Sequence, residues 1–74
     1  MNNERRKTLA KAQQLLEEAR DIISDVLDEE RDAYDNLPES FQNGERGETM
    51  GEAIDAMDTA VDDIDEAITY IEDL

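Results

Sequence analysis

The 74-residue sequence combines small size with a strongly acidic charge. Its 22 aspartates and glutamates outnumber 7 lysines and arginines, and the formal net charge of −15 excludes ordinary binding to nucleic acid or anionic membranes. The sequence contains no cysteine and no histidine, which excludes disulfides, thiolate metal sites and histidine-based catalysis. A chain of this length forms one small domain, residues 1–74, and usually needs a staple or a partner for stability.

Residues 3–36 have the apolar spacing of one long helix, without glycine or proline before Pro38. Glu30 interrupts the apolar series, and we expect the packing seam to fray there. Residues 1–11 carry four bases and a single acid, so this end of the helix has a local charge of +3. The two seven-residue series of this helix are Leu9, Leu16, Ile23 and Leu37, and Ala12, Ala19, Val26 and Ala33.

Residues 37–44 form the predicted linker between two helices. Proline disfavours helical geometry in the preceding residue, so the first helix should end near Asn36, and Pro38 can open one helical turn that reaches Gln42. A connection of this length normally joins antiparallel neighbours. An antiparallel arrangement is also expected to lay the basic segment 5–11 beside three acids near the C-terminus, Glu66, Glu72 and Asp73.

Residues 45–73 form the second predicted helix, whose start can be capped by Asn43 or by Thr49. Alanine recurs once per heptad on both helices, which allows the two backbones to approach closely. The sequence therefore predicts an all-α fold, an antiparallel two-helix hairpin with an alanine-rich coiled-coil seam. The predicted seam consists of Ala12, Ala19, Ala33, Ala53, Ala60 and Ala67.

The apolar stripe on each helix is three positions wide, whereas a two-stranded seam uses only two. We therefore expect two hairpins to pair as a homodimer in a four-helix bundle. The alternatives are docking of the surplus stripe on another protein, or a monomer with exposed aliphatic side chains. The predicted dimer interface consists of Leu15, Ile22, Leu27, Ile54, Val61 and Ile68.

Residues 37–48 carry the motifs "LPES.Q" and "ERGE", and an acidic segment rich in alanine and isoleucine follows them. This pattern resembles a group of small acidic helical proteins encoded by phages and prophages, over about residues 28–70. The sequence departs from that pattern at Gly44, where a helix-capping serine is usual, and at Phe41, where leucine is usual. The resemblance implies an origin in a mobile element and carries over no catalytic residue.

The acidic residues do not have the spacing of a metal or catalytic site. A calcium loop needs carboxylates at alternating positions and a glycine at the sixth, and a di-iron bundle needs Glu-x-x-His pairs. Paired carboxylates for hydrolysis need a cleft that raises one pKa, which a small helical hairpin does not offer. We therefore expect no enzyme activity, no metal and no cofactor.

Seven acids lie between residues 52 and 66, at about one charge per 3 Å of helix. This density is close to one charge per ~3.4 Å along a DNA strand. A solvated surface or adaptation to high salt would explain the acids equally well. The predicted partner-binding residues are Glu52, Asp55, Asp58, Asp62, Asp63, Asp65 and Glu66, with Asp21, Asp25 and Asp28 on the first helix.

Two functions remain open on the sequence alone. The first is a DNA-mimic inhibitor of the anti-defence type, which occupies a basic, nucleic-acid-binding surface of a host protein and does not bind nucleic acid itself. The second is a homo-oligomeric structural or regulatory accessory protein that binds through its aliphatic stripe. The polar N-terminus and the lack of a long apolar run predict a cytoplasmic protein, in the host cytoplasm if the gene belongs to a phage.

Overall fold

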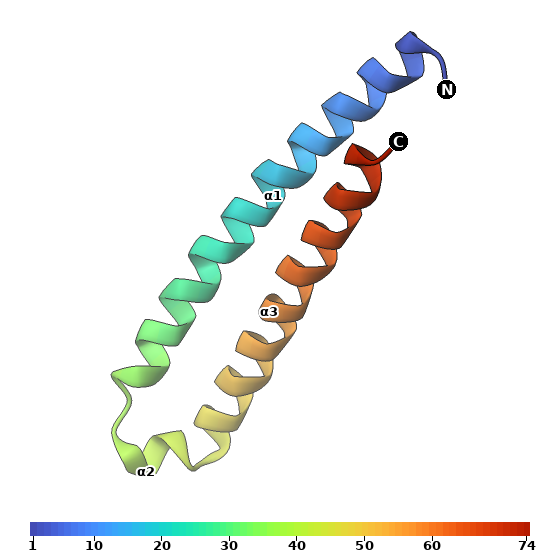
Figure 1. The fold of residues 1–74 in the computed structure, drawn as a ribbon. Helices are drawn as coiled ribbons and strands as arrows, with labels where there is room; N and C mark the ends of the chain where they lie inside the picture. The colour runs from blue at the N-terminus through green and yellow to red at the C-terminus, as the bar shows by residue number, and fades with distance from the viewer.

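The structure, a computed structural model, describes residues 1–74. It contains the helices α1 (Asn3–Asp35), α2 (Glu39–Gln42) and α3 (Glu45–Glu72), and no strands. α1 and α3 run antiparallel side by side, with α2 in the connection at one end and both termini at the other (Figure 1). The prediction of an all-α chain with two long packed helices is confirmed, and the result is a rod of 58 × 14 × 13 Å.

Local side-chain chemistry sets the ends of the helices. The Asn2 side chain accepts a hydrogen bond of 2.8 Å from the backbone N–H of Arg5 and caps α1. At the other end, the Gln42 amide donates a 2.9 Å hydrogen bond to the Tyr34 carbonyl, which ties α2 to the last turn of α1. Gly44 caps α3 without a side-chain hydrogen bond, so α3 starts before Thr49 and contains Gly47 and Gly51.

The core of the hairpin is narrow. Leu27 from α1 and Ile68 from α3 are the only buried apolar side chains, with 3% and 5% of their surface exposed. Both were predicted to face a second copy, and both lie instead between the two helices of one chain. Ile54 and Val61, from the same predicted interface, are half-buried along the α1–α3 contact.

The predicted alanine seam differs from the observed packing. Ala19, Ala33 and Ala53 are exposed, and the larger side chains next to them in sequence turn inward instead. Burial of a leucine or isoleucine removes far more apolar surface from water than burial of an alanine, at roughly 25 cal/mol per Å². Each helix is therefore rotated so that its alanines lie at the edge of the contact.

Three side-chain contacts define the axial register of the hairpin. Gln13 donates to Glu72 at 3.1 Å, Arg20 pairs with Asp65 at 2.9 Å, and Arg31 pairs with Asp58 at 3.4 Å. Since Glu72 at the end of α3 lies level with Gln13, residues 3–12 of α1 project beyond α3, which we call the basic overhang (Figure 1). Segment 5–11 forms no ion pair with the C-terminal acids, although Arg6, Leu9 and Ala10 line one hollow together with Ile71, Glu72 and Leu74.

Candidate functional site

The two long sides of the hairpin differ in chemistry, because acids and alanines occupy different positions relative to the core residues in the sequence. A residue one position after a core residue is rotated by about 100° to one flank of the helix, and a residue one position before it is rotated to the opposite flank. Because α1 and α3 are antiparallel, equivalent flanks of the two helices lie on the same side of the hairpin. Acids mostly follow core residues, and alanines mostly precede them.

The acidic side includes the two cross-helix ion pairs. Asp65 follows the half-buried Ile64 and reaches Arg20, while Asp58 follows Met57 and reaches Arg31. We define the acidic face by these acids and by those on the outer sides of the helices. Its members are Glu52, Asp55, Asp58, Asp62, Asp65 and Glu66 of α3, and Asp21, Asp25 and Asp28 of α1.

Part of this charge is neutralised within the chain. Hydrogen bonds to Asp65, and then to Asp21, raise the pKa of the Arg20 guanidinium above its ordinary value, so Arg20 stays protonated beside them. The Glu66 carboxylate accepts a 3.0 Å hydrogen bond from the Tyr70 hydroxyl. The carboxylates of the acidic face without an ion pair or hydrogen bond are Glu52, Asp55, Asp62, Asp25 and Asp28.

Asp63 lies apart from the other predicted partner-binding acids. It precedes Ile64 and is seven residues from both Ala56 and Tyr70, so it belongs to the opposite flank of α3. A row of seven consecutive acids on α3 is therefore not formed. The linear charge density along the acidic side of α3 is therefore lower than the sequence predicts. Asp25 and Asp28 of α1 add negative charge to the same face.

The opposite side of the hairpin is an apolar face. Leu15, Ile22 and Val26 of α1 have 51%, 64% and 45% of their surface exposed. They lie on the same side of the hairpin as small side chains of both helices. We call the apolar residues of this side the apolar face: Leu15, Ala19, Ile22, Val26 and Ala33 of α1 with Ala53, Ala56, Ala60 and Ala67 of α3; Glu29, Asp63 and Tyr70 lie on the same side. Leu15 and Ile22 are thus the only members of the predicted dimer interface that are well exposed.

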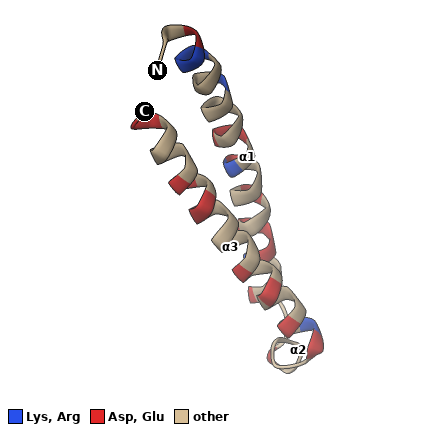
Figure 2. Cartoon of the chain, turned by 90° about the vertical axis from the view of Figure 1, so that its right-hand side faces the viewer, with Lys and Arg blue, Asp and Glu red and all other residues tan.

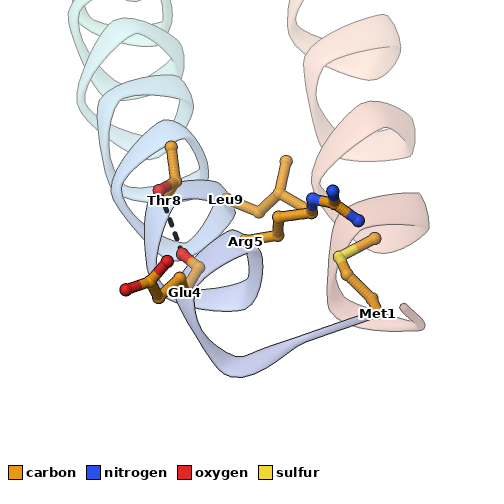
Figure 3. A pocket seen from close by; sticks show the side chains of 5 residues that line it. All are labelled: Met1, Glu4, Arg5, Thr8 and Leu9. Carbon is orange, nitrogen blue, oxygen red and sulfur yellow. Dashed lines mark hydrogen bonds between the residues drawn. The ribbon is translucent and has the colours of Figure 1, made fainter.

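The basic overhang is the third feature of the surface. Figure 2 shows basic residues gathered at the N-terminal end of α1, whereas acids follow α3 and the remainder of α1. None of Arg5, Arg6, Lys7 and Lys11 forms an ion pair. An open hollow of about 420 Å³ lies at this end, lined by Met1, Glu4, Arg5, Thr8 and Leu9 (Figure 3).

No three histidine, cysteine, aspartate or glutamate side chains lie close enough to hold a metal ion. Thr8, Thr49 and Thr69 each donate a hydrogen bond to the backbone carbonyl four residues earlier. None of the helices combines the length and apolar character needed to cross a membrane.

Comparison of the sequence with protein-family models, with curated proteins and with solved structures finds no match. The two faces and the basic overhang are therefore the features of the molecule that indicate a function.

Proposed function

We propose that this chain is a non-enzymatic, phage-encoded binding protein whose acidic face occupies a basic, nucleic-acid-binding surface of a host protein in the host cytoplasm. The observation that carries this proposal is the set of carboxylates on the acidic face that have no partner within the chain, contributed by both helices. Unpartnered carboxylates on a stiff scaffold present a fixed negative field, which attracts a basic surface and competes with nucleic acid for it.

The choice of aspartate supports this proposal. Aspartate is a poorer helix former than glutamate, by roughly a few tenths of a kcal/mol per position. Asp55, Asp62, Asp25 and Asp28 nevertheless all lie in helix interiors and make no hydrogen bond that would explain the choice. Their short side chains keep the charge close to the rigid backbone, as in a nucleic-acid strand.

The alternative is a homo-oligomeric accessory protein in which acidity serves only solubility. The exposed Leu15, Ile22 and Val26 favour this function, because a contiguous apolar surface usually marks a protein contact. The two functions are compatible in one molecule, since the acidic and apolar faces lie on opposite sides of the hairpin.

We further propose that two copies pair through their apolar faces into a four-helix bundle. Pairing would cover the three large aliphatic side chains that one hairpin leaves in water. Light scattering at micromolar concentration should give about twice the chain mass of 8.4 kDa.

The substitution Ile22→Glu tests this pairing. A charge at the centre of the apolar face should cost several kcal/mol of association free energy when it is buried without a partner, and the mass should fall to that of one chain. Gln14→Glu is the matched control, because it adds the same charge at an exposed position away from this face. If both variants had the mass of a dimer, the apolar face would not be the surface through which two copies pair.

Neutralising the acidic face tests the inhibitor function. The fourfold variant Asp25→Asn, Asp28→Asn, Asp55→Asn and Asp62→Asn removes four charges with little change in shape and leaves the Arg20 and Arg31 ion pairs intact. Added wild-type chain should release bacterial nucleic-acid-binding proteins from DNA-cellulose at low salt. The variant should release at least about tenfold less, because charge complementarity is lost.

The matched control carries Glu4→Gln, Glu29→Gln, Asp63→Asn and Asp73→Asn, which remove the same charge from the helix ends and the opposite face. It should release proteins as well as the wild type does. Equal release by all three chains would show that the acidic face is a solubility feature and that mimicry is wrong.

A further inference from the structure

The basic overhang contains four cations that form no ion pair, in a chain of net charge −15. It extends about 15 Å beyond α3, at 1.5 Å per residue over residues 3–12. Arg5, Arg6, Lys7 and Lys11 form no ion pair, although acids outnumber bases about three to one in the whole chain. Within one hairpin, the C-terminal end of the chain reaches only part of this segment, since Arg6, Leu9 and Ala10 line one hollow together with Ile71, Glu72 and Leu74.

The other end of the rod has the opposite character. Residues 28–52, which we call the linker end, contain nine acids and two bases. Of the two bases, Arg31 is paired with Asp58 and Arg46 forms no ion pair. The two ends of the molecule therefore carry opposite charges, with a basic overhang at one end and a net charge of −7 at the other.

The apolar face is centred between these two ends, nearer to the linker end. On α1 it runs from Leu15 to Ala33, centred at Ser24, and on α3 it runs from Ala53 to Ala67, centred at Ala60. The contacts Gln13–Glu72 and Arg20–Asp65 place residue 24 level with residue 61, so both halves of the face share one centre. A two-fold axis through this level would superpose the face of one copy on that of another.

We infer that two copies pair antiparallel through their apolar faces, so that the basic overhang of each lies against the acidic linker end of the other. With the two-fold axis at Ser24, residues 5–11 meet the segment around residues 37–48 of the second copy, which contains Glu39, Glu45 and Glu48. A parallel pairing would place the two linker ends together, and the like charges would repel. This inference rests on the pairing proposed above and adds its orientation.

The hollow in the overhang fits this arrangement. Its residues Arg5 and Thr8 continue the heptad series of the apolar face, since Thr8, Leu15 and Ile22 are seven residues apart. The same two-fold axis brings Phe41 of the second copy level with it. Phe41 is 52% exposed. Met1 and Leu9 provide apolar contacts for that ring, and Arg5 provides a cation for its face.

Distances between spin labels separate the orientations. The chain contains no cysteine, so Ala10→Cys and Ser24→Cys each give one labelled site, on the same flank of α1 and away from the apolar face. In the antiparallel pair, the Ala10 labels lie about 42 Å apart along the axis, whereas the Ser24 labels are level with each other. The lateral separation across the bundle contributes to both label-to-label distances. We therefore expect the measured Ala10 distance to exceed the measured Ser24 distance by about 20 Å, which is less than the axial offset.

Equal distances at the two sites would overturn the antiparallel orientation and leave the pairing itself intact. A mass of one chain, with no dipolar coupling at either site, would overturn both the pairing and the orientation. The mass and the distances therefore distinguish failure of the proposed dimer from failure of this inference.

Reversal of the overhang charge gives a second test. The triple variant Arg5→Glu, Arg6→Glu and Lys7→Glu should raise the dimer Kd by at least about tenfold at low salt, and this difference should shrink at high salt. Acids in the first turns of a helix favour helix formation, so the circular dichroism of the variant should be unchanged. An unchanged Kd would overturn the contact between the overhang and the linker end.

Discussion

Replacing Gly47 with alanine is expected to lower the free energy of unfolding by about 1–3 kcal/mol, and to release α2 from α3. Gly47 is buried, and a Cβ atom added there would lie 2.0 Å from the carbonyl oxygen of Gln42 and 2.5 Å from its carbonyl carbon. These atoms belong to the backbone, so no side-chain rotation can relieve the overlap. Thermal or urea unfolding followed by circular dichroism measures the loss.

Gly51→Ala is the matched control for this experiment. Gly51 also lies inside α3, and an added Cβ would meet nothing within 4 Å. Alanine is the better helix former by about 1 kcal/mol, so this variant should be more stable than the wild type. If the two glycine variants unfolded at the same temperature, Gly47 of α3 would not lie against Gln42 of α2 as it does in the structure.

Leu27→Ala is the other substitution with a large expected effect. It should lower the free energy of unfolding by about 2–4 kcal/mol, because it removes the most completely buried side chain and leaves a cavity between the helices. Leu74→Ala changes the same residue type at a site that is 55% exposed and should shift stability by no more than about 0.5 kcal/mol. Equal stabilities of the two variants would place Leu27 outside the core.

Much of the fold could be predicted from the sequence. The heptad spacing predicted α1 at about residues 3–36 and α3 at about residues 45–73, and the observed ends at Asp35 and Glu72 differ by one residue. Pro38 predicted both the end of α1 and the short helical turn. These features depend on local chemistry, since a residue before proline avoids helical geometry whatever surrounds it.

The rotation of each helix could not be predicted in the same way. An apolar stripe three positions wide allows two packing seams, one lined by alanines and one lined by larger aliphatic side chains. The prediction of the alanine seam was wrong. Leu27 and Ile68 were assigned to a second copy for this reason, although they fill the single hairpin. The choice depends on how much apolar surface each rotation buries, which requires the positions of both helices.

The axial register, which residue of α1 lies level with which residue of α3, also could not be predicted from the sequence. Heptad spacing shows which side of a helix packs, but it does not show which residue of the other helix lies level with it. The hydrogen bond of Gln42 to Tyr34 and the close approach at Gly47 determine how the chain reverses. They place Glu72 beside Gln13, and the segment from Arg5 to Lys11 consequently extends past the last helical residue of α3 and forms no ion pair.

The most direct test of the proposed function is the salt dependence of partner capture. Chain immobilised through its C-terminus should retain bacterial nucleic-acid-binding proteins at low ionic strength. It should lose them at about 0.5 M salt, where charges more than a few ångströms apart are screened. Added duplex DNA should displace the same proteins at low salt. Capture that persists at high salt and in the presence of DNA would contradict binding through the acidic face, and would favour an accessory protein that binds through its apolar face.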